Sequence, residues 1–314
     1  MVEKKKTSKY QVDELDLMLI KELEANSRQS NRRIAKKLGV TSTTVQVRLQ
    51  RLLDEKMIKI IPVLNPVAMK FQTRAFFGLN IRRPGTCDAA VEYLKPLACV
   101  QTINIATGCF DMTLFAVFHD IEEMLGFFDG ELSKVPGLAT IEELMVLKVV
   151  KRTWAHNDGS VGLAGLSRHR DLDESETRLI DALKLNPRET NMNLSRKLGL
   201  SRKVISRKLT GLVNDNIIAF TILVIPERSA VQAQVLLKVY PGEINNVAAA
   251  LAANERIAHV LIVSGQFKVY FAAVFRNLEE CASFINEETR KIPGIISHKT
   301  AVSVAVLKQS VLLG

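Results

Sequence analysis

The stretch LGVTSTTVQVRLQRLL, residues 38–53, decides the fold because it joins a turn to an amphipathic helix. Gly39 is typical of the residue that ends a helix, and Thr41 is typical of the residue that caps the next one. Three apolar residues then follow at helical spacing and predict one buried stripe: Val45, Leu49 and Leu52. With the helical periodicity of residues 15–38 before it, the stretch indicates a helix-turn-helix unit.

The chain contains this pattern twice. Residues 198–213 read LGLSRKVISRKLTGLV, and downstream the segment TGCFD at 107–111 is matched by SGQFK at 264–268. A period of roughly 160 residues is too long for a solenoid repeat, so each copy is expected to be a complete unit of two parts. Between the copies, residues 153–170 are rich in glycine and serine, which favours a flexible linker.

The second part of each copy changes from helical to strand periodicity. Apolar and polar residues alternate over 71–82, which predicts a strand with one buried face, and residues 231–239 repeat the alternation. Further elements follow in the first copy: a helix at 88–97, two β-rich runs that meet at Gly108, a helix opened by a capping box at Asp120 and Glu123, and a β-rich run at 140–151. This order is the ferredoxin-like split βαβ, an antiparallel sheet with two helices on one face.

The composition of the 314-residue chain is that of a globular protein, with 47% apolar and 24% charged residues. No apolar run approaches the roughly 18 residues that a membrane-spanning helix needs, so we expect no membrane association. The first residues carry no secretory signal, and the expected location is cytoplasmic. The four cysteines lack metal-ligand spacing, so we expect no metal site and no cofactor.

The net charge of +10 is concentrated in two segments. Residues 26–53 carry seven Arg or Lys residues and residues 190–214 carry six, and neither segment contains an acidic residue. Solvated helix faces usually mix both signs, so acid-free basic segments favour a polyanionic partner. Double-stranded DNA is therefore the predicted partner of both helix-turn-helix units.

In a helix-turn-helix unit, the second helix of the motif lies in the major groove with its N-terminal residues at base edges. The first copy offers short hydroxyl and amide side chains there, with cations nearer the phosphates, whereas the second copy is far more cationic. The predicted DNA-binding residues are Arg32, Arg33, Ser42, Thr43, Thr44, Gln46, Val47, Arg48, Gln50 and Arg51 in copy one, and Arg202, Lys203, Ser206, Arg207, Lys208 and Thr210 in copy two.

A helix-turn-helix followed by this α/β domain, with T-G-x-x-D between the central strands and V-P-G at 135–137 before the last strand, resembles the Lrp/AsnC family of feast/famine transcriptional regulators. The predicted fold is α+β, and two winged helix-turn-helix DNA-binding domains alternate with two ferredoxin-like βαββαβ domains, also called RAM domains. The predicted bounds are 10–64 and 171–224 for the DNA-binding domains, 68–152 and 228–312 for the ferredoxin-like domains, and 153–170 for the linker.

The resemblance implies amino-acid sensing by the α/β domains, and assembly either as a homo-oligomer or as an intrachain pseudo-dimer. The effector loop would lie between the central strands, so the predicted effector-binding residues are Thr107, Gly108, Cys109 and Asp111 in copy one, and Ser264, Gly265 and Lys268 in copy two. A carboxylate suits the ammonium group of an amino acid, whereas a lysine reverses that charge. We therefore expect sensing to rest mainly on copy one.

Two alternatives to a sensing regulator stay open. Siroheme decarboxylases are similar in layout, but their chemistry depends on His and Arg residues around the central strands. In this sequence only His259 lies near those strands. Because no catalytic constellation repeats in both copies, we do not expect an enzyme. The second alternative is an architectural DNA-binding protein without an effector, which charge alone does not exclude.

Overall fold

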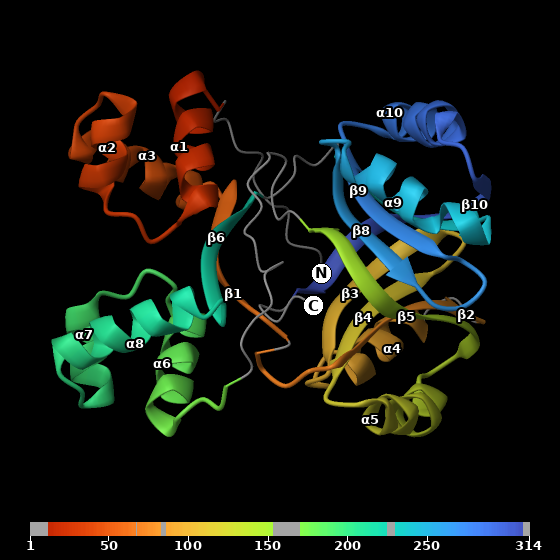
Figure 1. The fold of residues 1–314 in the computed structure, drawn as a ribbon, viewed down its shortest axis with the longest axis horizontal. Coiled ribbons are helices and arrows are strands. Elements are labelled where there is room, and N and C mark those ends of the chain that lie inside the picture. The colour runs from red at the N-terminus through yellow and green to blue at the C-terminus, as the bar shows by residue number, and fades with distance from the viewer. Residues whose placement is uncertain (1–11, 67, 83–85, 153–169, 225–229, 310–314) are drawn as a thin grey trace.

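The computed structural model describes residues 12–66, 68–82, 86–152, 170–224 and 230–309. These residues form two bodies: a helical body with a two-stranded sheet, and a closed barrel with helices around it (Figure 1). Apart from Arg170, the predicted linker at 153–170 lies outside the described residues. In the described part of the chain, no helix is long and apolar enough to cross a membrane.

The first helical unit consists of α1 (Glu14–Ala25), α2 (Asn31–Leu38) and α3 (Ser42–Asp54). Gly39 ends α2 in the left-handed conformation with a φ of 67°, which glycine adopts without steric cost. Thr41 caps α3 because its hydroxyl accepts a hydrogen bond from the backbone N–H of Thr44. The apolar stripe of α3 is buried against α1 and α2, so the predicted helix-turn-helix packing is confirmed for this unit.

The same three-helix arrangement recurs in α6 (Glu174–Leu185), α7 (Asn191–Leu198) and α8 (Arg202–Asn214). Gly199 ends α7 with a φ of 69°, and the Ser201 side chain caps α8. Ile205 and Leu212 of α8 are buried against α6 and α7. The turn chemistry of the first unit is therefore repeated in the second.

The strand that follows each unit is not a wing of its own domain, which corrects the winged arrangement expected from the sequence. β1 (Ile58–Leu64) and β6 (Ile218–Val224) pair with each other in antiparallel register, with Ile61 opposite Thr221. A lone strand leaves its backbone N–H and C=O groups unpaired, and pairing across the copies satisfies these groups in both strands. The two-stranded sheet therefore joins the two helical units (Figure 1).

The first α/β copy contains β2 (Thr73–Ile81), α4 (Thr86–Leu94), β3 (Val100–Gly108), β4 (Met112–Phe118), α5 (Ile121–Gly126) and β5 (Leu138–Arg152). The second copy contains β7 (Val231–Val239), α9 (Ile244–Ala252), β8 (Ile257–Val263), β9 (Val269–Phe275), α10 (Leu278–Ser283) and β10 (Ile295–Gln309). Short π- or 3₁₀-helical turns lie at Phe127–Glu131, Leu132–Lys134, Pro241–Glu243, Phe284–Glu288 and Thr289–Lys291. Each copy thus has the predicted order strand, helix, strand, strand, helix, strand.

The two four-stranded sheets join edge to edge into one closed barrel, in the order β10-β3-β4-β2-β5-β8-β9-β7. Within each copy the strands keep the ferredoxin-like order, and the copies meet where β5 pairs with β8 and where β10 pairs with β3. Closure leaves no unpaired strand edge in the barrel. The pseudo-dimer predicted as one alternative is thus formed within a single chain.

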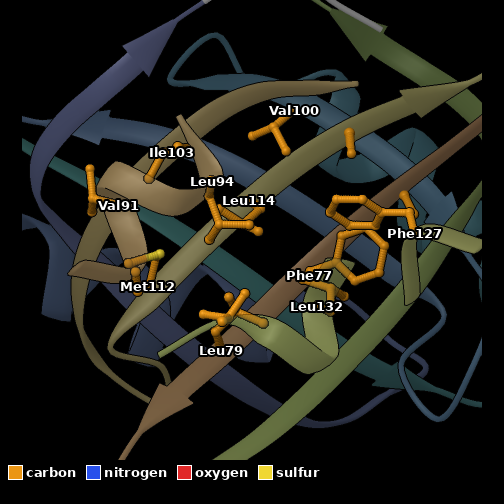
Figure 2. Close-up of a cluster of buried hydrophobic side chains, with 14 of the residues drawn as sticks. Phe77, Leu79, Val91, Leu94, Val100, Ile103, Met112, Leu114, Phe127 and Leu132 are labelled. Atoms are coloured by element: carbon orange, nitrogen blue, oxygen red, sulfur yellow. The ribbon is translucent and has the colours of Figure 1, made fainter. Parts of the chain in front are cut away.

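The outer face of each sheet packs against its own helices. In the first copy, Phe77 of β2 lies beside Phe127, in the same apolar cluster as Val91 and Leu94 of α4 (Figure 2). The ring centroids of Phe77 and Phe127 are 5.6 Å apart. The second copy has an equivalent core between its sheet and α9 and α10, so the prediction of helices on one face is confirmed.

The inner faces of the two sheets are also buried, so the single buried face expected for residues 71–82 was wrong. Phe76 points away from Phe77, yet it is only 2% exposed, and its ring centroid lies 5.1 Å from that of Tyr270 on β9. Phe110 and Phe267 complete the apolar core inside the barrel. Barrel closure buries this second face, and periodicity within one strand does not reveal it.

The capping box expected at Asp120 and Glu123 forms only one of its two hydrogen bonds. The Asp120 carboxylate accepts a hydrogen bond from the backbone N–H of Glu123 at 2.8 Å. The Glu123 carboxylate, however, accepts from the backbone N–H of His119 at 2.6 Å instead of reaching residue 120. The second copy repeats this arrangement, since the Glu280 carboxylate accepts from the N–H of the residue before Asn277.

Candidate nucleic-acid interface and effector loops

The exposed side of α3 carries most of the side chains predicted to meet DNA. Its exposed members are Ser42, Thr43, Gln46, Val47, Gln50 and Arg51. Arg32 and Arg33 of α2 are exposed beside the start of α3, and with Ser42 they line an open hollow of about 600 Å³. Hydroxyl and amide groups on this surface can read base edges, and an apolar Val47 suits a thymine methyl group.

Two of the predicted residues also make contacts within the first unit. The Thr44 hydroxyl lies 2.9 Å from the Thr41 hydroxyl, so Thr44 contributes to the cap of α3 and is half-buried. Gln50 donates from Nε2 to Asp54 at 2.8 Å on the exposed surface. Gln50 can exchange that contact for a base edge, whereas Thr44 is held by the cap.

Arg48 and its counterpart Lys208 are engaged in ion pairs, and this does not support the DNA contacts predicted for them. Arg48 Nη1 lies 2.6 Å from Asp13 and 2.9 Å from Asp16, whose side chain is fully buried. Lys208 pairs in the same way with Asp173. The hydrogen bond from Arg48 lowers the pKa of the Asp13 carboxyl, and that from Lys208 lowers the pKa of the Asp173 carboxyl. These pairs fasten α3 and α8 to the caps of α1 and α6.

The equivalent surface of α8 is more cationic than that of α3. Its exposed predicted residues are Arg202, Lys203, Ser206, Arg207 and Thr210. Helix α8 contains no acidic residue, so the positive charge on this surface has no carboxylate within the same helix. Guanidinium and ammonium groups at these positions can contact phosphates or the edges of guanines.

A reciprocal pair of arginines holds the two helical units together, and one of them, Arg28, belongs to the first basic segment. Arg28 donates to the backbone carbonyl oxygens of Pro187 and Glu189, at 2.5 and 3.0 Å. Arg188 donates to the carbonyl oxygen of Gln29 at 2.9 Å. Burial lowers the pKa of both guanidinium groups. The alignment of Arg28 with Arg188 between the two copies was the sequence signal that could have revealed this contact. Because the arginines join the two units, a single body carries both α3 and α8.

The first predicted effector loop lies against a strand of the other copy. Gly108 has a φ of 108°, and a Cβ there would lie 2.5 Å from the carbonyl oxygen of Thr300 on β10. The half-buried Cys109 donates its backbone N–H to the same oxygen at 3.0 Å, and burial raises the pKa of its thiol. Exposed Asp111 accepts a hydrogen bond from the backbone N–H of Ile81 at 2.8 Å. Thr107 pairs with β10 as well.

The second predicted loop makes the corresponding contact with the first copy. Ser264 donates its N–H to the carbonyl of Met145 on β5, and its hydroxyl accepts the N–H of Met145, both at 2.9 Å. Gly265 has a φ of 82°. The ammonium group of Lys268 donates to the Gly265 carbonyl at 2.6 Å. Both loops therefore lie at the seams between the copies, where a bound molecule would touch both halves of the barrel.

These features define a class of protein: a helix-turn-helix DNA-binding body joined to paired ferredoxin-like domains. Residues 12–53 match the AsnC-type helix-turn-helix domain. Residues 74–155 and 232–313 each match the Lrp/AsnC ligand binding domain. The chain belongs to the Lrp/AsnC family, with the ligand binding domain present twice.

Relatives of the chain are about half its length. An uncharacterised HTH-type transcriptional regulator of Pyrococcus abyssi is 28% identical over 148 residues, which cover 47% of this chain and 93% of that protein. The HTH-type transcriptional regulator Ptr1 of Methanocaldococcus jannaschii is 28% identical over 141 residues, which cover 45% of this chain and 95% of that protein. One such relative therefore corresponds to one copy, consistent with a tandem duplication.

A solved structure with similarity over nearly the whole chain is that of the siroheme decarboxylase NirDL. Its TM-score is 0.66 at 11% identity, and the match covers 94% of this chain and 93% of that chain. Identity this low shows a shared fold alone. The duplicated architecture therefore also occurs in an enzyme, and the architecture does not distinguish regulation from catalysis.

Proposed function

We propose that this chain is a DNA-binding transcriptional regulator that carries two DNA-reading units and two effector domains in one polypeptide. The observation that carries the proposal is the pair of exposed, acid-free surfaces over residues 42–51 of α3 and 202–214 of α8. The pairing of β1 with β6 supports simultaneous presentation of both surfaces. The membership of the Lrp/AsnC family supports the regulatory role.

In this proposal the reading units occupy residues 10–64 and 171–224, and the effector domains occupy 68–152 and 228–312, with a linker at 153–170. Hydroxyl and amide groups of α3 read base edges in the first unit, and Arg32 and Arg33 contact phosphates. The guanidinium and ammonium groups of α8 contact guanines or phosphates in the second unit. Arg48 and Lys208 act as positioning residues that hold these helices.

The proposed effector is an amino acid bound at the loop of residues 107–111. Exposed Asp111 offers a carboxylate for the ligand ammonium, while Gly108 and the Cys109 N–H are engaged with the Thr300 carbonyl. Because this loop contacts Thr300 of the other copy, a ligand bound at the loop can alter the contact between the two halves of the barrel. An architectural protein would lack this response.

Duplex binding measured against salt concentration tests the proposal. If six or more phosphates are engaged, affinity should fall by roughly 10³ or more between about 50 and 200 mM salt. Arg202→Gln with Arg207→Gln should flatten that dependence, whereas Lys95→Gln, at an exposed residue directly after α4, should leave it unchanged. Salt-independent binding, or no binding to any genomic fragment, would refute DNA regulation.

Siroheme decarboxylation is the second candidate function, because the fold similarity to NirDL extends over 94% of the chain. We place it behind regulation because His259 is the only histidine within strands β3, β4, β8 and β9, all of which are described. Incubation of the protein with siroheme, followed by absorbance and product analysis, separates the two functions. Turnover of the tetrapyrrole would establish the enzyme, and unchanged siroheme would support the regulator.

A further inference from the structure

The two copies differ in charge at matched positions at the end of the barrel that holds the 107–111 and 264–268 loops. Strand register defines the matches, because Ala75 of β2 and Ala233 of β7 occupy equivalent places opposite β4 and β9. Asn80 in copy one and Lys238 in copy two each lie five residues after the matched alanine, so they form the first matched pair. A second matched pair, in the loops, is Asp111 and Lys268, whose backbone N–H groups donate to the carbonyls of Leu79 and Leu237.

Another matched pair lies on the long last strand of each copy. Glu142 of β5 is opposite Gly78 of β2, and Lys299 of β10 is opposite Leu236 of β7. Gly78 and Leu236 are themselves equivalent, since each lies three residues beyond the matched alanine. Copy two therefore has lysine at all three positions where copy one has an amide or a carboxylate.

Two of these lysines gather over one aromatic ring. Lys238 Nζ lies 5.7 Å and Lys299 Nζ lies 5.3 Å from the ring centroid of Phe267, which is itself 1% exposed. The register explains the proximity, because Lys238 is two residues beyond the residue opposite Lys299 and so lies diagonally across from it. Lys268 follows Phe267 in the sequence, but its ammonium group donates to the Gly265 carbonyl, so the cluster consists of Lys238 and Lys299.

The lysine cluster of Lys238 and Lys299 has little carboxylate to neutralise it. Lys299 Nζ lies 3.8 Å from Glu142, and that carboxylate already accepts hydrogen bonds from Gln266 at 2.9 and 3.1 Å. Among the described residues, Glu142 is the one carboxylate in an ion pair with the cluster. The Phe267 ring attracts both ammonium groups but carries no net charge, so a positive surplus remains.

We infer that the lysine cluster is a binding site for a compact dianion, either a dicarboxylate or a phosphate group. Two ammonium groups held over the Phe267 ring suit a ligand with two negative charges. They repel the ammonium group of a zwitterionic amino acid. This inference deepens the proposed function, because it assigns the second effector domain a ligand class different from that of the first. The inference rests on the proposed function only where it concerns an effect of the ligand on DNA binding.

Calorimetric titration of the full chain with inorganic phosphate and with succinate tests the site. Sodium chloride at matched ionic strength and glycine serve as the comparison solutes. The parent protein should bind at least one dianion more tightly than chloride or glycine, and the dianion that binds identifies the source. The double variant Lys238→Asn with Lys299→Gln should bind roughly ten- to a hundredfold more weakly. The exposed control Lys95→Asn should bind like the parent.

A second variant tests the geometry itself. Glu142→Gln removes the carboxylate that competes for Lys299, so it should strengthen dianion binding severalfold. Circular dichroism confirms that each variant is folded. A parent protein that binds neither dianion more tightly than chloride, a double variant that binds like the parent, or a Glu142→Gln variant that binds more weakly would each overturn the inference.

DNA binding measured on the same samples keeps the two proposals apart. Tight dianion binding by a protein that binds no DNA would support the site while refuting the regulator. DNA binding without dianion binding would overturn the site and leave the regulator standing.

Discussion

Glu24 is a carboxylate buried where the two helical units meet. It is 4% exposed at the end of α1, and its backbone carbonyl accepts a hydrogen bond from the Thr221 hydroxyl of β6. Burial raises the pKa of its carboxyl from 4.5 to about 7, with Lys21 opposing the shift. The contact between the units should therefore respond to pH near neutrality.

Glu24→Gln should stabilise the protein at about pH 8 and have little effect at about pH 4. The folded pKa lies above the unfolded value, so the stabilising contribution of the protonated carboxyl is complete below about 4.5 and is lost as pH rises through about 7. The gain at the higher pH should be roughly 1 to 3 kcal/mol. Urea unfolding at both pH values checks this, with exposed Glu55→Gln as the control; equal gains at both pH values would contradict it.

Asp111→Asn should weaken the response to a zwitterionic amino acid while leaving effector-free DNA binding intact. The asparagine oxygen can still accept the N–H of Ile81, so the loop is preserved and only the negative charge is lost. The expected loss of ligand affinity is roughly ten- to a hundredfold. Calorimetry on this variant, beside exposed Asp129→Asn, measures the effect; unchanged affinity would exclude Asp111 as the ammonium partner.

At the scale of elements, α3 and α8 have the same frame but different surfaces. Both begin at a side-chain cap after a left-handed glycine and both are anchored by an ion pair to the preceding cap. Their exposed positions differ, because Ser42, Thr43 and Val47 of α3 are replaced by Arg202, Lys203 and Arg207 of α8. Packing constrains the buried stripe, whereas the exposed face is left to vary with the DNA that it meets.

The parent protein should therefore select two dissimilar half-sites rather than a palindrome. Replacing Ser42→Arg, Thr43→Lys and Val47→Arg gives α3 the three exposed cations of α8, and the selected sites should then shift toward an inverted repeat. Binding-site selection with randomised duplexes compares the two proteins. A perfect inverted repeat selected by the parent protein would count against distinct readers.

At the scale of the whole molecule, contacts between the copies close both bodies. β1 pairs with β6 in the helical body, and the barrel closes where β5 meets β8 and where β10 meets β3. Arg28 and Arg188 add reciprocal hydrogen bonds between the helical units. A single chain therefore supplies the contacts that two separate half-length chains would otherwise have to make by association.

The melting temperature should accordingly be independent of protein concentration. Folding that requires a second chain is destabilised by dilution, whereas a fold closed within one chain is not. Thermal unfolding over a roughly hundredfold range of concentration, with light scattering at each point, checks this. A melting temperature that falls on dilution would show that the folded unit needs a partner chain.

Much of the fold could be predicted from the sequence because it depends on neighbouring residues. Gly39 and Thr41 define the turn and cap before α3, and the apolar spacing of that helix defines its buried face. The match between copies extends these conclusions to α8, and strand alternation with helix signals predicts the βαββαβ order. The acid-free segments mark the surface proposed for DNA in the same local way.

Only the tertiary structure decided which of those residues are available to a ligand. Arg28 and Arg48 belong to the first basic segment, yet they lie in contacts between or within the helical units. Phe76 is buried because a second sheet, more than a hundred positions away in the chain, closes over it. Such contacts depend on the free energy of burying distant surfaces together, and a periodicity measured within one segment carries no information about its distant partner.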